Sequence, residues 1–301
     1  MEKRAFGRTG MQVSVLGFGG SEIGHQGALQ ADVDRLLNSA LDAGLNVIDT
    51  AECYKNSEEL IGKAVGHRRR EYFLFTKVGH ENGWDAGEDY SAASIARSIE
   101  RSLKRLKTDV LDLVQLHSCS AATLKKGEAI EALGKARAAG RTRFIGYSGD
   151  STDALFAIES GAFDALQTSV SIADQESIDL LLPAATKRGM GVIAKRPIAN
   201  AAWRYSETPE NDYYTEYWKR LRELRFDFAV PGSAKPEAAS IALRFTLAMP
   251  GVHTAIVGTK NPDRWKQNAE LLKAGPLPKG QIDAIRAKWN EVAKRDWVGQ
   301  V

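Results

Sequence analysis

The sequence predicts an α/β protein of the (β/α)8 or TIM-barrel class, with a short N-terminal β-hairpin and an extra C-terminal helix. Short apolar runs rich in β-branched and aromatic residues alternate with longer stretches whose apolar residues recur at helical spacing. Eight such pairs fit within 301 residues, and a barrel of eight strand–helix units needs roughly 250 residues. An open doubly wound sheet shows the same alternation over fewer units.

The eight predicted strands are short apolar runs, and a hairpin with its turn at residues 8–10 precedes the first of them. In chain order, the predicted strands cover residues 13–18, 46–49, 72–77, 110–117, 144–148, 165–169, 192–195 and 254–258.

Each strand is followed by a stretch in which apolar residues recur every three or four positions, as on one face of a helix. Gly44 ends the first of these helices, and we expect Ser57 to cap the second. The predicted helices cover residues 31–43, 57–65, 91–106, 126–139, 152–159, 176–187, 236–247 and 263–272, and residues 281–293 form the extra C-terminal helix. Between residues 197 and 235 the pattern lapses, and we predict irregular structure there.

Since no linker or break in composition interrupts the chain, residues 1–301 are expected to form a single domain.

The composition excludes several classes of protein. The 41 Lys and Arg residues alternate with 38 Asp and Glu residues, and the run at residues 67–70 is the one local basic excess, so we expect no nucleic-acid partner. No apolar run approaches the roughly 20 residues that span a bilayer, and the N-terminus lacks an apolar signal core. These features predict a cytoplasmic protein with no membrane partner. Cys53 and Cys119 are expected to be reduced thiols.

Polar residues collect at the C-terminal ends of the predicted strands. Asp49, Lys77, His117, Ser148 and Gln167 each follow an apolar run, and active sites of barrels are built on this end. Taken alone, Asp49 is a plausible helix cap, His117 a plausible core histidine, and Lys77 needs a partner or water for its ammonium group. Together, on one end of one barrel, they favour an active site, and we predict no metal in it.

Four segments resemble the aldo-keto reductase superfamily, and they follow one another in order along nearly the whole chain. They are VIDTAECY at residues 47–54 with SEELIGKA at 57–64, FTKV at 75–78, DLVQLH at 112–117, and IVGTKNP at 256–262 continuing to Asn268.

The resemblance implies reduction of a small aldehyde or ketone to an alcohol, or the reverse oxidation, by hydride transfer with NADP(H). It implies that Tyr54 is the general acid or base and that Lys77 lowers its pKa. Asp49 would hold Lys77, and His117 would orient the carbonyl oxygen and share in proton transfer. We expect a monomer or a weak homo-oligomer.

The resemblance also implies where the cofactor binds. Ser148 and Gln167 match positions that hold the nicotinamide carboxamide, although Gly149 stands where the family usually has Asn. The seventh strand departs further. Lys195 and Arg196 replace a segment that carries a stacking aromatic residue in many relatives, and we predict that one of the two lies at the cofactor.

The adenosine end of the cofactor is implied by the eighth strand and the helix after it. Gly258 and Thr259 would bring the backbone close to a phosphate, and Lys260 and Arg264 match positions that grip the 2′-phosphate. Asn268 matches the adenine contact.

Loops after the strands are expected to form the substrate pocket. The candidate pocket residues are Ser21, Cys53, Trp84, Cys119 and Trp203. Trp203 and Tyr205 are candidates for a lid, and the two thiols for oxidation sensitivity.

Two other functions remain open. A lyase would form a Schiff base on Lys77 or Lys195. A regulatory subunit would bind NADPH as a redox sensor with slow or no turnover.

Overall fold

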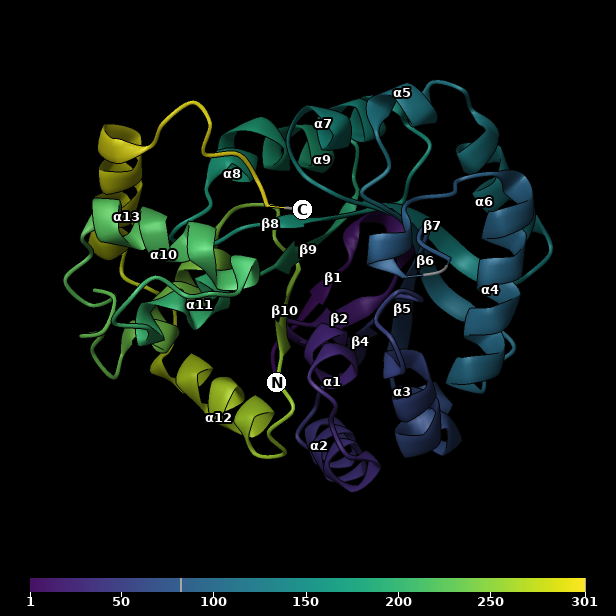
Figure 1. Ribbon diagram of the computed structural model, residues 1–301, viewed down its shortest axis with the longest axis horizontal. Coiled ribbons are helices and arrows are strands. Elements are labelled where there is room, and N and C mark those ends of the chain that lie inside the picture. Colours follow the sequence, from purple (N-terminus) through teal and green to yellow (C-terminus); the bar gives the residue numbers. More distant parts are fainter. Residues whose placement is uncertain (82, 301) are drawn as a thin grey trace.

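The centre of the molecule is a closed barrel of parallel strands (Figure 1). The computed structural model describes residues 1–81 and 83–300. The strands are arranged in the order β10-β3-β4-β5-β6-β7-β8-β9, and β10 pairs with β3 to close the barrel. They are β3 (Leu16–Gly19), β4 (Val47–Asp49), β5 (Phe73–Val78), β6 (Leu111–His117), β7 (Thr142–Ser148), β8 (Ala165–Ser169), β9 (Gly191–Lys195) and β10 (Thr254–Gly258). The predicted (β/α)8 barrel is confirmed.

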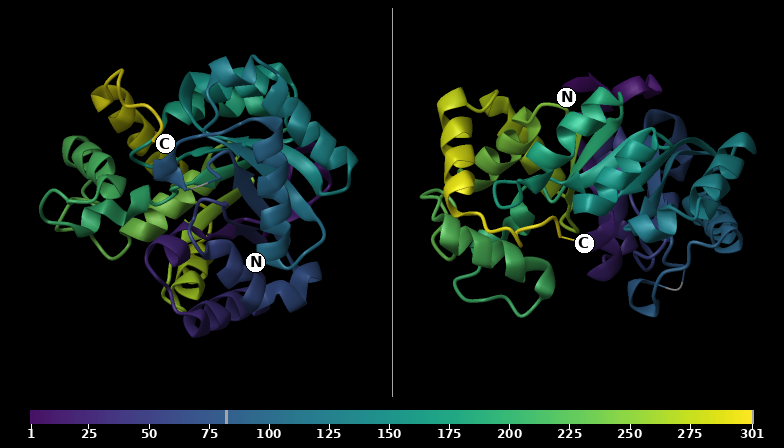
Figure 2. Two further views of the ribbon diagram at one scale, coloured as in Figure 1. Left: turned by 45° about the vertical axis from the view of Figure 1, so that its right-hand side comes forward. Right: turned by 90° about the horizontal axis from the view of Figure 1, so that it is seen from above.

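Helices surround the barrel on its outside, as Figures 1 and 2 show from three directions. The helices are α1 (Ser21–His25), α2 (Gln30–Asp42), α3 (Ser57–Val65), α4 (Ala92–Leu106), α5 (Ala121–Leu124), α6 (Glu128–Ala138), α7 (Ser151–Ser160), α8 (Glu176–Leu180), α9 (Leu182–Lys187), α10 (Asp212–Leu224), α11 (Ala238–Ala248), α12 (Arg264–Leu271) and α13 (Lys279–Val292). Short 3-10 helices cover Gly7–Thr9, Gly66–Glu71, Trp84–Ala86, Ala199–Arg204 and Leu272–Ala274. The helix α13 packs beside α10 on the left of Figure 1.

The predicted N-terminal hairpin is confirmed and closes one end of the barrel. Its strands are β1 (Lys3–Ala5) and β2 (Gln12–Ser14), which pair antiparallel. Phe6, between them, is fully buried and stacks on Phe75 at 5.7 Å. Gly7 has φ of +52°, and a Cβ atom there would lie 2.3 Å from the backbone nitrogen of Gly191, so only glycine fits this approach.

The interior of the barrel explains why polar residues stand at the strand ends. An apolar layer holds Val47, Phe75, Leu113, Ala165, Ile193 and Ile256 next to the hairpin. Because side chains alternate along a strand, the residue two positions further on faces inward again. Those next inward positions are Asp49, Lys77, Gln115, Gln167, Lys195 and Gly258. The same alternation that builds the core therefore brings the polar residues together above it.

The structure corrects three predicted elements. The predicted strand at 13–18 is two strands, β2 and β3, because the chain changes from pairing with β1 to pairing inside the barrel. The predicted helix at 176–187 is divided at Leu181, just before Pro183, which cannot continue the hydrogen-bond ladder. The segment predicted to be irregular contains α10.

The predicted capping role of Ser57 is also wrong. Ser57 is the first residue of α3 rather than its N-cap. Its hydroxyl donates to the carbonyl of Gly20 at 2.7 Å and pairs with the hydroxyl of Thr50 at 2.9 Å. It therefore ties α3 to the loop after β3.

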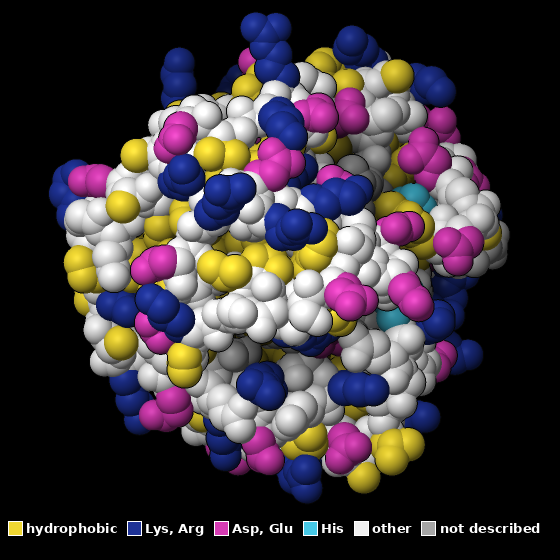
Figure 3. Space-filling view, turned by 60° about the vertical axis from the view of Figure 1, so that its left-hand side comes forward, with side chains coloured by type: hydrophobic (Ala, Val, Ile, Leu, Met, Phe, Trp, Pro, Cys, Tyr) yellow, Lys and Arg dark blue, Asp and Glu magenta, His cyan; other side chains and the backbone are white. Residues whose placement is uncertain are grey.

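The surface carries charges of both signs. On the face drawn in Figure 3, Lys and Arg side chains are interspersed with Asp and Glu side chains. Within residues 1–81 and 83–300, none of the helices combines the length and the apolar character that crossing a membrane requires.

Candidate active site

A cavity of about 480 Å³ lies at the C-terminal ends of the barrel strands. Its wall contains Asp49, Lys77, His117, Ser148 and Gln167, which come from five different strands. Tyr54 reaches the same cavity from the loop after β4. The structure thus brings together residues that are spread over more than a hundred positions of the chain.

Asp49 and Lys77 form a buried ion pair at the base of the cavity. The Lys77 ammonium lies 2.5 Å from Oδ1 of Asp49, and their side chains are 2% and 1% exposed. Lys77 also donates to the carbonyl of Thr50 at 2.9 Å. The amides of Gln167 and Gln115 donate to the two carboxylate oxygens of Asp49 at 3.1 and 3.3 Å. Because two charges are costly to bury unless each is satisfied, these contacts hold the pair in one geometry.

Tyr54 lies between this ion pair and His117. The Lys77 ammonium is 5.2 Å from the centre of the Tyr54 ring. The imidazole of His117 meets that ring edge-on, with the ring centres 5.7 Å apart. The predicted four-residue constellation of Asp49, Tyr54, Lys77 and His117 therefore exists as one group of contacting side chains.

The electrostatics of Tyr54 differ from the expectation. Burial raises the pKa of the Tyr54 phenol well above its ordinary value, and the neighbouring Cys53 and Asp49 raise it further. A lowered pKa was expected because Lys77 is close. The physical reason for the difference is that burial disfavours the charged phenolate, and that Asp49, 2.5 Å from Lys77, offsets the positive charge of Lys77. Tyr54 therefore holds its proton, which is the form that a proton donor needs.

His117 shows the opposite shift. Burial lowers the pKa of the imidazole well below its ordinary value, and the positive charge of Lys77 adds to the effect. His117 is therefore neutral near pH 7, with one nitrogen that donates and one that accepts a hydrogen bond. The backbone carbonyl of His117 accepts hydrogen bonds from the hydroxyl of Tyr90 and from Nε2 of His80, the latter at 3.0 Å.

The two thiols are protonated. Burial raises the pKa of both Cys53 and Cys119 to about 12. Because the thiolate is the reactive form of cysteine, the structure does not support the hypothesis of oxidation sensitivity.

At the expected nicotinamide position, side chains at the ends of β7 and β8 form hydrogen bonds with other residues of the protein. Ser148 and Gln167 are on the cavity wall, and Gln167 contacts Asp49 as described above. Asp150, next to Gly149, is buried and accepts hydrogen bonds from the Thr168 hydroxyl and the Ser169 amide, both at 2.7 Å.

Lys195 and Arg196 line the cavity. Lys195 forms an ion pair with Asp150 at 2.8 Å, and both cations donate to the carbonyl of Gln300, Lys195 at 3.2 Å. The guanidinium of Arg196 also lies 5.6 Å from the ring of Tyr213. The C-terminal segment therefore meets the cavity at these two side chains.

The residues predicted to bind the adenosine phosphate follow β10. Gly258 is on the cavity wall, and the other four predicted residues follow it in the chain without lining the cavity. Thr259 is buried and its hydroxyl accepts from the amide of Asn261 at 3.0 Å. Lys260 and Arg264 are exposed, and Asn268 is buried in α12. Lys260 donates to the carbonyl of Gln26 at 3.4 Å, so the end of α1 lies close to this loop.

The predicted substrate-pocket residues divide into two groups. Ser21, Cys53 and Trp84 are on the cavity wall. Cys119 and Trp203 are buried and lie outside the residues that line it. Cys119 follows β6, its carbonyl accepts from the Tyr147 hydroxyl at 2.7 Å, and its thiol is packed in the core. Trp203 is likewise packed in the core around the barrel.

Several residues of the site were not predicted from the sequence. Tyr213 and Asn211 reach the cavity from the start of α10, and His25 reaches it from the end of α1. His80 supports the wall by stacking on Trp84 at 4.2 Å. A signal for α10 was present, because its buried residues recur at helical spacing: Tyr214, Tyr217, Trp218, Leu221 and Leu224.

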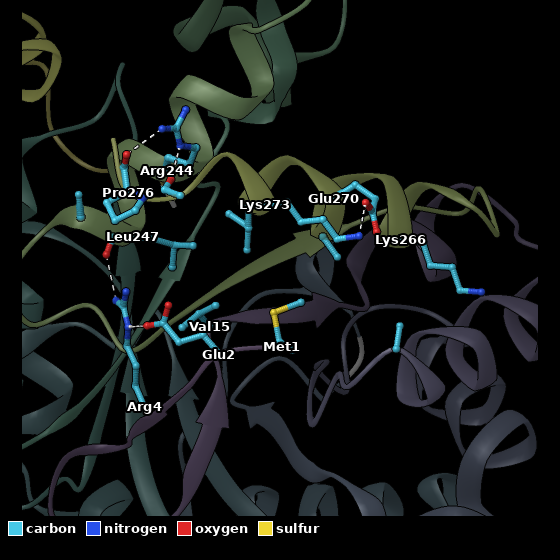
Figure 4. Close-up of a pocket in the computed structure, with 15 residues that line it drawn as sticks. Met1, Glu2, Arg4, Val15, Arg244, Leu247, Lys266, Glu270, Lys273 and Pro276 are labelled. Carbon is cyan, nitrogen blue, oxygen red and sulfur yellow. Dashed lines mark hydrogen bonds and ion pairs between the residues drawn. The ribbon is translucent and has the colours of Figure 1, made fainter. Parts of the chain in front are cut away.

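A second cavity, of about 460 Å³, lies at the opposite end of the barrel (Figure 4). Two of its arginine side chains connect separate parts of the fold. Arg4 donates to the carbonyls of Leu247 and Val252, both at 2.9 Å. Arg244 donates to the carbonyl of Gly275 at 2.6 Å. The N-terminal end of a barrel generally serves stability, so the cavity that contains Asp49 and His117 is the candidate active site.

Comparison with known proteins agrees with this geometry. The sequence profile of the Aldo/keto reductase family matches residues 15–290, and the chain belongs to this family of oxidoreductases, which act on small carbonyl compounds.

Among similar proteins is the L-galactose dehydrogenase of Arabidopsis thaliana, which is 30% identical over 90% of this chain and 88% of its own length. An uncharacterised oxidoreductase of Bacillus subtilis is 28% identical over 95% of this chain and 96% of its own. The holo form of an aldo-keto reductase from Bacillus halodurans superimposes with a TM-score of 0.82, at 28% identity and 99% coverage of both chains. An aldo/keto reductase from Klebsiella pneumoniae in complex with NADP and acetate gives a TM-score of 0.76, at 25% identity over 100% of this chain and 99% of its own.

Proposed function

We propose that this protein is an NADP(H)-dependent reductase of small aldehydes or ketones, or an oxidant of the corresponding alcohols, with Tyr54 as the proton donor or acceptor. The observation that carries the proposal is the buried Asp49–Lys77 pair with Tyr54 and His117 around one cavity. The pairing of β10 with β3 closes the barrel, so the site needs strands from both ends of the chain. We therefore propose that residues 1–301 form one domain.

The residues present fit a nicotinamide dinucleotide. Gly19, Gly20 and Gly258 line the cavity at the ends of β3 and β10, where a Cβ atom at Gly20 would lie 2.7 Å from the hydroxyl of Ser57, so the backbone itself forms this part of the wall. The N-cap of α12, Asp263, makes no side-chain hydrogen bond to the first turn, and the exposed cations Lys260 and Arg264 flank it. A helix N-terminus with two adjacent cations suits a phosphate group. The neighbour from Klebsiella pneumoniae in complex with NADP supports the choice of NADP.

Each protein residue then has one part in the chemistry. Bound NADPH would supply the hydride. Tyr54 donates its hydroxyl proton to the carbonyl oxygen, and the resulting phenolate lies beside the ammonium of Lys77. Asp49 keeps Lys77 in place. His117, which is neutral, donates a hydrogen bond to the same carbonyl oxygen and helps orient it.

The replacement Tyr54→Phe tests this assignment. It removes one oxygen atom and the proton, so we expect the rate of reduction to fall about 100- to 10,000-fold, the usual range for a general acid. NADPH binding, measured by fluorescence titration, is expected to stay within twofold. A Tyr54→Phe enzyme that retains near-normal turnover would exclude Tyr54 as the proton donor.

The substrate is found by following NADPH oxidation with a panel of aldehydes, ketones and aldoses. Aldoses belong in the panel because a relative is named L-galactose dehydrogenase. The alternatives give different results. Covalent trapping of a carbonyl compound by borohydride on Lys77 or Lys195 would indicate a Schiff-base lyase, and tight NADPH binding without turnover would indicate a regulatory subunit.

A further inference from the structure

The thiol of Cys53 contacts the imidazole of His117. Sγ lies 3.4 Å from Nδ1, although the two residues are 64 positions apart. Cys53 lies in the turn after β4, immediately before Tyr54, and His117 ends β6. Both side chains are buried, with exposed fractions of 5% and 8%. The contact therefore belongs to the wall of the candidate active site.

The two nitrogens of His117 have different surroundings. Nδ1 faces Cys53. In the described part of the chain Nε2 makes no hydrogen bond, and it is not fully buried. It is therefore open to the cavity that His117 lines. The two hydrogen bonds to the backbone carbonyl of His117, from Tyr90 and His80, hold the residue on its other side.

The protonation of both partners limits the possible arrangements. Burial raises the pKa of Cys53 to about 12, so Sγ carries its hydrogen at neutral pH. Burial also keeps His117 neutral. A neutral imidazole carries one N–H, and the hydrogen bond at one nitrogen selects the tautomer. If Sγ–H donates to Nδ1, the proton of the ring must be on Nε2.

We propose that Cys53 is a positioning residue whose thiol donates to Nδ1 of His117 and so holds the imidazole in the tautomer with its Nε2–H directed into the cavity. A carbonyl oxygen in the cavity then receives two hydrogen bonds, one from Tyr54 and one from His117. In the opposite tautomer Nε2 presents a lone pair, which repels a carbonyl oxygen. The consequence for catalysis rests on the proposed function, whereas the tautomer itself does not.

The tautomer is measured directly by nitrogen NMR on protein labelled with ¹⁵N-histidine. His117→Gln identifies the His117 signals by their loss. In the wild-type protein we expect Nδ1 to give the signal of an unprotonated nitrogen and Nε2 that of a protonated one. In Cys53→Ala the Nδ1 signal shifts and the two tautomers mix, and in Cys53→Ser, which retains a donor, the wild-type pattern returns. A protonated Nδ1 in the wild-type protein, or an unchanged spectrum in Cys53→Ala, would overturn the proposal.

Kinetics test the consequence separately. We expect kcat for carbonyl reduction to fall about 10-fold in Cys53→Ala, roughly the effect of one hydrogen bond, while KM for NADPH is unchanged. Cys53→Ser restores most of this loss. Cys119→Ala, which removes a buried thiol that does not line the cavity, is the matched control and retains both kcat and the His117 spectrum.

The two measurements separate the two claims. If the wild-type protein reduces no carbonyl compound but shows the expected tautomer, the proposed function fails and the contact of Cys53 with His117 stands. If Cys53→Ala shifts the tautomer with no change in kcat, the positioning role is overturned. Circular dichroism of each variant confirms that it is folded, and a Cys53→Ala protein that does not fold leaves the wild-type spectrum and Cys53→Ser as the deciding comparison.

Discussion

At the scale of single residues, the site depends on charges that are buried together. Lys77 and Asp49 are almost inaccessible to solvent and lie 2.5 Å apart. Removing one charge leaves the other buried without its partner, which generally costs about 3–5 kcal/mol. Removing both eliminates that penalty.

We therefore expect Lys77→Met to lower the free energy of unfolding by about 3–5 kcal/mol, and Asp49→Asn by a similar amount. The double variant should be destabilised by clearly less than the sum of the two, because neither charge is then stranded. Urea unfolding of the four proteins measures the coupling. Additive losses would show that the two charges do not stabilise one another.

The neutral His117 makes stability depend on pH. The pKa of its imidazole is lowered by burial in the folded protein, whereas in the unfolded chain it is about 6.5. Below that value the unfolded chain binds a proton that the folded protein does not, so stability falls as the pH decreases. The slope from this one residue approaches about 1.4 kcal/mol per pH unit.

We expect the free energy of unfolding of the wild-type protein to decrease between pH 7 and pH 5 more steeply than that of His117→Gln. Urea unfolding at several pH values measures both slopes. His25 and His253 also have lowered pKa values, but they are present in both proteins and cancel in the comparison. Parallel curves would mean that His117 takes up a proton in the folded state.

At the scale of elements, two helical glycines have different surroundings. In α3, a Cβ atom at Gly62 would lie 2.1 Å from the carbonyl oxygen of Arg105, so α3 and α4 touch at this point. In α6, a Cβ atom at Gly134 would meet nothing within 4 Å. The first glycine is required by packing, and the second only lowers helix propensity.

We therefore expect opposite effects from the same replacement. Gly62→Ala should destabilise the protein by about 1–3 kcal/mol or more, because backbone must move. Gly134→Ala should stabilise it by about 0.5–1 kcal/mol. Thermal and urea unfolding compare the two directly. A Gly62→Ala protein as stable as the wild type would mean that α3 and α4 separate without cost.

The elements also show which sequence patterns are sufficient to predict the bounds of a helix or strand. The bounds of α3, β8 and β10 agree with those expected from the sequence. The boundary at Val15 was not visible, because Val13, Val15 and Leu16 continue one strand-like pattern across it and only the pairing partners of β2 and β3 differ. The helix α10 was missed because it lies in a long segment without the strand–helix alternation, although its apolar spacing is regular.

At the scale of the whole molecule, binding of a cofactor stabilises the entire barrel. A ligand at 100 times its dissociation constant raises the free energy of unfolding by about 2.7 kcal/mol. If Lys260 and Arg264 hold a 2′-phosphate, this stabilisation is larger for NADPH than for NADH at the same concentration.

We expect the double variant Lys260→Ala/Arg264→Ala to lose most of the rise in Tm caused by NADPH while the rise caused by NADH is unchanged. Lys266→Ala is the matched control, because Lys266 is an exposed cation of the same helix that lines the cavity at the other end of the barrel. Equal losses for NADPH and NADH would contradict recognition of a 2′-phosphate by these side chains.

The sequence alone determined the barrel, and it determined which residue types stand at the strand ends. Both follow from local patterns: apolar runs of strand length, helical spacing, and polar residues at the ends of the runs. Residues two positions apart on a strand face the same side whatever the rest of the chain does.

The tertiary structure decided what those side chains contact. Three contacts join residues that are 28 to 64 positions apart in the chain. They are the ion pair of Asp49 with Lys77, the ion pair of Asp150 with Lys195, and the contact of Cys53 with Nδ1 of His117. Such distances follow from the closure and register of the barrel, which bring separate strands to one cavity. Burial in that cavity then sets the pKa values of Tyr54 and His117, and no local pattern in the sequence contains that information.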